Sequence, residues 1–184
     1  MEVFINKMRR LKGIRKLILI EEAWKAIAKE GMAEYIKYLF KTVRKFFGEA
    51  IVVTQEVDDI IQSPIVKESI INNSDCKILL DQRKYINKFA DIQAMLGLTD
   101  KEKAQVLSIN MNNDPSRLYK EVWIGLGGTE SAVYATEVSK EEYLAYTTEE
   151  TEKMEVMQLA AELGGNVELA IKHIAIQQKE KTNK

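Results

Sequence analysis

Two adjacent carboxylates, Glu21 and Glu22, directly follow an apolar run at residues 17–20, and we call them the carboxylate pair. Four large apolar residues without alternation predict a strand buried on both faces, as in a parallel sheet. Open α/β sheets place ligands at the carboxyl ends of such strands. During nucleotide hydrolysis, one carboxylate there holds Mg²⁺ and the next deprotonates the attacking water. The pair also fits a helix N-terminus, where the dipole favours acids without any chemistry.

A polar amide follows the next predicted strand. Residues 50–54 form a second apolar run, and Gln55 comes directly after it. If the two strands are neighbours, this amide lies beside the carboxylate pair, where it senses a γ-phosphate or positions water. The alternative is an ordinary polar residue at a strand end.

Two arginines are candidates for stabilising phosphate charge in a transition state. Arg44 lies on the predicted helix before the second strand, and Arg83 follows a third apolar run at residues 77–80. Either guanidinium can act from the same or a neighbouring subunit. Each arginine is equally compatible with an exposed surface position.

Three other features favour ordinary structural roles. The glycine-rich stretch at residues 125–128 lacks the Lys-Ser/Thr of a phosphate loop and lies between two β-like runs, which predicts a hairpin turn. His173 has no second imidazole or cysteine nearby in the sequence, and Cys76 opens a predicted buried strand as a small apolar filler.

The elements that position these residues alternate between strand and helix over the first 80 residues. Strands at 17–20, 50–54 and 77–80 are separated by a long amphipathic helix, from Trp24 to a stop at Gly48, and by a helix that starts at Ser63-Pro64. This rhythm predicts right-handed crossovers and a parallel sheet. Further helices, two of them with capping boxes (Thr99 with Glu102, Ser139 with Glu142), flank a predicted hairpin of strands at 119–126 and 132–138.

Composition bounds the function. The chain has 184 residues, 27 Lys and Arg, 28 Asp and Glu, and a net charge of −1, which gives no global argument for nucleic-acid binding. One cysteine excludes a disulfide framework, and no apolar run is long enough to span a membrane. Residues 7–16 hold six Lys and Arg without an acid, which indicates a solvated helix end or a patch for nucleic acid or acidic lipid.

Taken in order, these segments resemble the carboxyl-terminal half of the TraG-type ATPases of conjugative transposons. The resemblance rests on residues 17–24, the Arg44-Lys45 step, residues 53–55, residues 77–80 and the Leu-Gly-Leu-Thr-Asp-Lys-Glu stretch at 96–102, and it covers about residues 1–176. These ATPases drive type IV secretion and belong to the HerA–FtsK branch of RecA-like P-loop NTPases. The implied fold class is α/β: a partial RecA-like parallel sheet with flanking helices, a β-hairpin and C-terminal helices.

The resemblance assigns roles to single residues. It places Glu21 at the metal-binding acid of a Walker B element, where the family usually has Asp, and Glu22 at the catalytic glutamate. Gln55 matches the motif that senses the nucleotide state, and Arg44 matches an arginine that acts across a subunit interface. The implied cofactors are ATP and Mg²⁺.

The nine glycines offer no G-x-x-x-x-G-K-[ST] phosphate loop. We therefore expect residues 1–138 to be the motor domain from Walker B onward, 139–178 a helical region and 179–184 a disordered tail. The chain alone is expected to bind ATP weakly and to be inactive.

The resemblance also implies a hexamer of the full-length protein, contacts with other secretion proteins and a cytoplasmic place, peripheral at the inner membrane, with DNA contact only weakly suggested. The alternative function is a non-catalytic module that binds partner proteins of the secretion machine.

Overall fold

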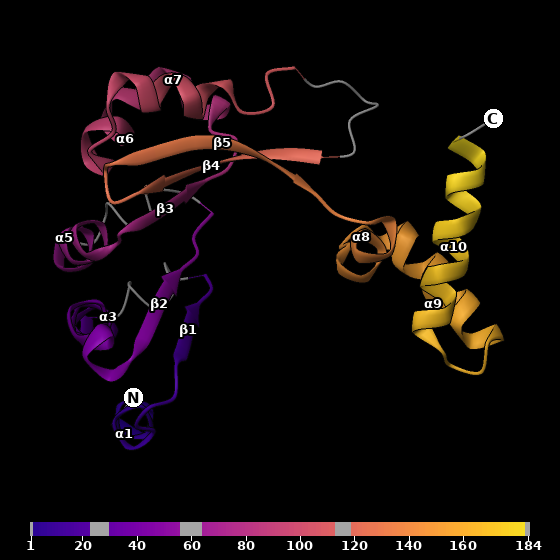
Figure 1. Cartoon of the computed structure of the whole chain (residues 1–184), viewed down its shortest axis with the longest axis horizontal. Coiled ribbons are helices and arrows are strands. Elements are labelled where there is room, and N and C mark those ends of the chain that lie inside the picture. The colour runs from indigo at the N-terminus through magenta and orange to yellow at the C-terminus, as the bar shows by residue number, and fades with distance from the viewer. Residues whose placement is uncertain (1, 23–29, 56–63, 113–118, 183–184) are drawn as a thin grey trace. The chain divides into compact units, whose positions relative to one another are not determined.

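A computed structural model describes residues 2–22, 30–55, 64–112 and 119–182. The chain divides into two compact units, the first formed by residues 1–111 and 122–134, the second by residues 112–121 and 135–184. Figure 1 shows the helices and strands in chain order along its colour ramp. The α/β class predicted from the sequence is confirmed.

The first unit begins with a two-stranded parallel sheet. Its elements are α1 (Glu2–Arg10), β1 (Lys16–Ile20), α3 (Glu30–Thr42), the 3₁₀ helix η1 (Val43–Phe46), β2 (Gly48–Val52) and α5 (Pro64–Asn73). Strands β1 and β2 pair in parallel from Lys16 opposite Gly48 to Ile20 opposite Val52. The neighbouring strands that the sequence predicted are therefore present, and α3 connects them in Figure 1.

Only one face of the parallel sheet is covered by the described residues. Ile18 is 7% exposed and packs with Leu39 of α3 and Met8 of α1. Side chains alternate across a strand, so Leu17 and Leu19 point to the other face, where they remain 65% and 59% exposed. The prediction of burial on both faces is thus wrong for β1, because the described helices flank one face alone.

The helix before β2 ends earlier than its apolar pattern predicted. The α-helix stops at Thr42 and tightens into η1, and Phe47 then turns the chain with φ +53°. Gly48 is the first residue of β2 rather than a helix stop, and a Cβ there would lie 2.8 Å from Val43 Cγ2. Close packing therefore requires glycine at this position. The predicted helix start at Trp24 lies outside the described residues.

A three-stranded sheet follows, in the order β3-β4-β5, from β3 (Cys76–Leu79), β4 (Tyr119–Leu126) and β5 (Glu130–Glu137). Strand β3 pairs antiparallel with β4, with Leu79 opposite Trp123, which corrects the expectation of a third parallel strand. Nor is β3 buried, because Ile78 is 60% exposed. The partner of β3 is the hairpin strand β4. The alternation of strands and helices along the sequence did not indicate that pairing.

Helices cover one face of this antiparallel sheet and form the best-packed core of the first unit. They are the 3₁₀ helix η2 (Arg83–Lys88), α6 (Phe89–Leu96) and α7 (Asp100–Ser108). Phe89, Val106 and Trp123 are each at most 1% exposed. Gln105 Oε1 accepts hydrogen bonds from Trp123 Nε1 at 3.1 Å and Ser131 Oγ at 3.0 Å, which satisfies the indole within the core.

The second unit contains three packed helices. These are α8 (Lys140–Tyr146), α9 (Glu150–Glu162) and α10 (Val167–Thr182), and their core includes Leu144, Val156 and Ile174. The capping box of Ser139 and Glu142 at the start of α8 is confirmed. Helix α10 continues beyond Lys179, whose Nζ lies 3.6 Å from Glu141 Oε1.

Candidate active site

The parallel pairing of β1 with β2 brings the polar residues after each strand to one edge of the sheet. The last paired residues are Ile20 and Val52, and the Val53 amide donates a 2.9 Å hydrogen bond to the Ile20 carbonyl. Because the carboxyl ends of parallel strands share an edge, the carboxylate pair leaves the sheet beside the segment that leads to Gln55. The sequence placed the Gln55 amide beside the carboxylate pair on the condition that the two strands are neighbours. The pairing of β1 with β2 meets that condition.

The side chains at this edge face solvent, and one has an unusual backbone. Glu21, Glu22 and Gln55 are all exposed. Glu22 has φ +50°, in the left-handed region where residues other than glycine are uncommon. Such a conformation costs about 1–3 kcal/mol and is found preferentially at functional sites. The left-handed backbone of Glu22 could not be predicted from the sequence, because glutamate is not a residue that favours the left-handed region.

The carboxylate pair suits a magnesium ion that is held partly by phosphate. Mg²⁺ prefers oxygen ligands and is usually bound through one or two carboxylates together with substrate phosphates and waters. Within the described residues there is no cluster of three or more His, Cys, Asp or Glu that would hold a metal by itself. The Glu21 carboxylate has the chemistry to share a nucleotide-bound Mg²⁺ with phosphate oxygens and waters.

The glycine-rich stretch does not form a phosphate cradle. Gly127 and Gly128 have φ +55° and +70°, and the Thr129 amide donates to the Leu126 carbonyl at 3.1 Å. Two left-handed central residues are typical of the tight turns that join hairpin strands. The prediction of a hairpin turn is therefore confirmed.

Arg44 lies at the opposite edge of the parallel sheet from the carboxylate pair. It belongs to η1, which precedes β2, whereas Gln55 follows β2. A five-residue strand separates them, roughly 17 Å at about 3.3 Å per residue. Its Nη1 lies 3.5 Å from Asp75 Oδ2, and the two side chains are 73% and 78% exposed. Within one chain, Arg44 is not brought to the carboxylates.

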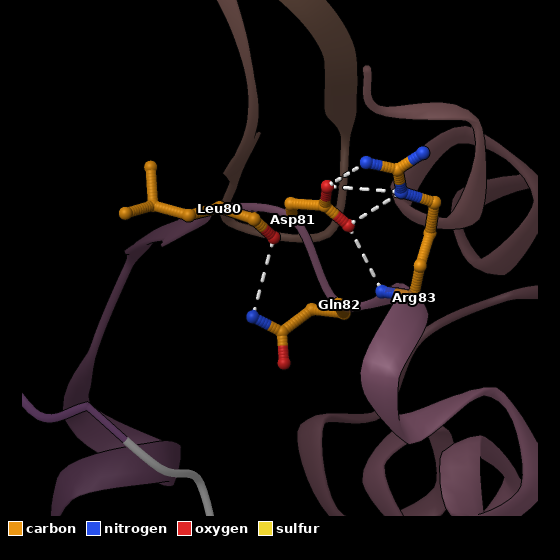
Figure 2. Close-up of polar contacts among 4 residues, drawn as sticks. All are labelled: Leu80, Asp81, Gln82 and Arg83. Atoms are coloured by element: carbon orange, nitrogen blue, oxygen red, sulfur yellow. Dashed lines mark hydrogen bonds and ion pairs between the residues drawn. The ribbon is translucent and has the colours of Figure 1, made fainter. Parts of the chain in front are cut away.

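Arg83 is held by its own neighbour (Figure 2). Its Nε lies 2.9 Å from both carboxylate oxygens of Asp81, and its backbone amide donates to Asp81 Oδ1 at 3.0 Å. These hydrogen bonds lower the pKa of the Asp81 carboxyl and raise that of the Arg83 guanidinium. Beside them, Gln82 Nε2 donates to the Leu80 carbonyl at 3.2 Å. Arg83 is therefore committed to a local ion pair, and Arg44 is the more available guanidinium.

We assign no chemistry to Cys76 or His173. Cys76 is exposed, so it is not the buried filler that the sequence suggested. His173 is exposed on α10, in the second unit.

Within the part of the chain that the structure describes, no helix is both long and apolar enough to cross a membrane.

Two comparisons with known proteins found matches. A family model described as the TraG P-loop domain matches residues 1–178. Among solved structures, VirB4 of Thermoanaerobacter pseudethanolicus is similar, with a TM-score of 0.55 and 21% identity over 76% of this chain. The match spans 36% of that VirB4 chain, or about a third of its length. No curated protein matches.

Proposed function

Because the chain belongs to the TraG P-loop domain family, we propose that it is the carboxyl-terminal part of an ATPase motor of a conjugative transposon. The motor would couple ATP hydrolysis to type IV secretion and DNA conjugation. One observation carries the proposal: the parallel pairing of β1 with β2, which places the carboxylate pair beside the strand that ends before Gln55. A phosphate-binding loop from outside these residues completes the proposed site, so the chain by itself is inactive.

The proposed roles follow from the chemistry of the side chains. Glu21, at the Walker B position, provides carboxylate oxygen to Mg²⁺, directly or through water. Bound Mg²⁺ supplies charge neutralisation on the phosphates. Glu22, the second acid of the pair, is the proposed general base, and its carboxylate accepts a proton from the attacking water. The Gln55 amide holds that water or contacts the γ-phosphate, as a polar group on the neighbouring strand.

Arg44 is proposed to act on the nucleotide of a neighbouring subunit. Its place at the amino edge of the sheet and its exposed side chain suit a contact outside its own chain. An arginine supplied from another chain stabilises transition-state charge in many phosphoryl-transfer enzymes. The role requires the full-length protein to self-associate, for which we propose the hexamer that the family resemblance implies.

The proposal also includes the partners and the cellular location of the motor. Other proteins of the secretion machine are its expected partners, and its place is cytoplasmic, peripheral at the inner membrane. If the longer protein bound partners but never hydrolysed ATP, the alternative of a non-catalytic interaction module would replace this proposal.

Gln55→Ala tests the site in the longer protein that supplies the phosphate loop. We expect kcat to fall on the order of ten- to a hundredfold, because a misplaced water reacts slowly, with only modest loss of ATP affinity. Steady-state ATPase assays and ATP titrations measure the two effects. Gln158→Ala, an exposed amide of the second unit, is the control. An unchanged kcat in a well-folded Gln55→Ala protein would remove Gln55 from the site.

A further inference from the structure

Positive charge is concentrated where the chain enters the parallel sheet. Residues 7–16 hold six Lys and Arg, residues 41–48 hold three more, and neither segment contains an acid. All 28 acids and the other 18 Lys and Arg lie elsewhere in the sequence. Because β1 and β2 are parallel, both basic segments lead into the same edge of the sheet, opposite the carboxylate pair. The parallel sheet therefore has a basic segment pair at its amino edge and the carboxylate pair at its carboxyl edge.

Hydrogen bonds bring the two basic segments together. The Lys16 amide donates to the Phe47 carbonyl at 3.0 Å, and Lys16 Nζ donates to the Phe46 carbonyl at 2.7 Å. Arg9 Nη2 donates to the Tyr38 hydroxyl at 2.9 Å. This hydrogen bond lowers the pKa of Tyr38, and the nearby charge of Lys45 lowers it further. The cations of α1 and of η1 thus lie around one phenol.

Large apolar side chains are exposed among these cations. Leu11, Ile14 and Phe47 are 37%, 55% and 58% exposed. Phe47 is held at φ +53°, an outlier for a bulky residue, in the turn between η1 and β2. Strained backbone clusters at functional sites, which makes the exposed Phe47 ring a candidate for a functional contact.

The surface that results is defined by these exposed residues, and we call it the amino-edge surface: Lys7, Arg10, Leu11, Lys12, Ile14, Arg15, Lys45 and Phe47. Among the described residues, two acids pair with arginines at this edge of the sheet. Glu49 pairs with Arg15, whose Nε lies 3.0 Å from Glu49 Oε1, and Asp75 pairs with Arg44. Lys7, Arg10, Lys12 and Lys45 are exposed.

We propose that the amino-edge surface binds a bilayer rich in anionic phospholipids. Clustered Lys and Arg are attracted to acidic headgroups, and adjacent apolar side chains enter the boundary between headgroups and acyl chains. Leucine and isoleucine tips add nothing to a contact with the phosphates of a nucleic acid, which favours lipid as the partner. The inference does not depend on ATP hydrolysis and gives the proposed peripheral location a physical basis.

Vesicle co-sedimentation of the 184-residue chain tests the charge component. Binding is measured on phosphatidylcholine vesicles with and without phosphatidylglycerol. The triple variant Lys7→Gln, Arg10→Gln, Lys12→Gln is expected to lose roughly tenfold or more in affinity for the anionic vesicles. The control variant Lys88→Gln, Lys101→Gln, Lys153→Gln removes the same charge from exposed positions elsewhere and is expected to bind as the wild type.

A second variant tests the apolar component without risk to the fold. Phe47→Asn removes the ring and suits the left-handed turn, so we expect unchanged or higher thermal stability with weaker vesicle binding. Tyr146→Asn, which removes an 82% exposed ring of the second unit, is the control. Equal binding to neutral and anionic vesicles, or wild-type binding by the triple variant, would overturn the proposal. Binding to duplex DNA without binding to anionic vesicles would overturn it in favour of nucleic acid.

Discussion

In the first unit, strained left-handed backbone lies beside the parallel sheet, whereas the described left-handed residues of the antiparallel sheet and its helices are glycine or asparagine: Gly97, Asn110, Gly127 and Gly128. The segment before β1 also has a left-handed glycine, Gly13 at φ +73°. The parallel sheet is bordered in addition by Glu22 at φ +50° and Phe47 at φ +53°. Glycine adopts this region freely and asparagine tolerates it, whereas glutamate and phenylalanine are strained there. The strain thus falls at the two edges for which we propose functions.

Within the described residues, each sheet packs helices on one face and leaves the other face exposed. Trp123 of the antiparallel sheet is 1% exposed, with its indole N–H satisfied by Gln105, and Ile18 of the parallel sheet is 7% exposed. On the other faces, Ile78 of β3 and Leu19 of β1 are 60% and 59% exposed. The two sheets therefore differ at their edges rather than in their faces, because the strained Glu22 and Phe47 border the parallel sheet alone.

The largest expected effect is on the core of the antiparallel sheet. Trp123→Ala should lower the free energy of unfolding by about 3–5 kcal/mol, because it opens a cavity in a closed core. Leu19→Ala in the parallel sheet should change it by no more than about 0.5 kcal/mol, as at other exposed positions. Denaturant titration measures both values. Equal losses in the two variants would show that burial does not decide the cost of truncation at these two positions.

A smaller effect, of opposite sign in the two regions, is expected from exchanging glycine and side chain. Glu22→Gly should raise the free energy of unfolding by about 1 kcal/mol, since glycine relieves the left-handed strain. Gly97→Ala, at φ +67° with nothing near its Cβ, should lower it by about 1 kcal/mol. Thermal unfolding of the two variants gives the signs. A destabilised Glu22→Gly protein would contradict the expected gain from relieved strain.

The smallest expected effect is the pH-dependent contribution of Asp81. Its pKa is lowered in the folded chain by the hydrogen bonds of Arg83, so its contribution to stability is present above the pKa of the unfolded chain. That contribution disappears as the pH falls through the folded pKa. Asp81→Asn should therefore cost no more than about 1 kcal/mol at neutral pH, because the pair is partly exposed. Urea titrations at neutral and strongly acid pH should show the difference from wild type vanishing in acid; a difference independent of pH would contradict it.

Local features of the fold could be predicted from the sequence because they are decided within a few residues. The capping box of Thr99 and Glu102 forms as expected, since both partners lie within one turn of helix. The hairpin turn at Gly127 and Gly128 is equally local. The pairing of β3 with β4 could not be foreseen, because it joins Cys76 to a residue 50 positions away, Leu126. The exposure of one sheet face likewise depends on which helices reach it.

The candidate site shows the same division. The order of strands and acids was sufficient to place the carboxylate pair beside the segment leading to Gln55, because parallel strands share a carboxyl edge. The separation of Arg44 from that edge follows from the same topology. The left-handed turn at Glu22 had no local signal, because it arises from how the chain leaves β1 and not from a residue that prefers the conformation.

The most direct test of the central claim is the ATPase rate of Glu22→Gln in the longer protein that supplies the phosphate loop. The amide keeps the shape of the side chain but cannot accept a proton from water. We therefore expect turnover to fall on the order of 10²-fold or more while ATP binding persists. Glu130→Gln, an exposed acid of the antiparallel sheet, should leave both unchanged. Turnover of Glu22→Gln near the wild-type rate would contradict the assignment of the carboxylate pair to water activation.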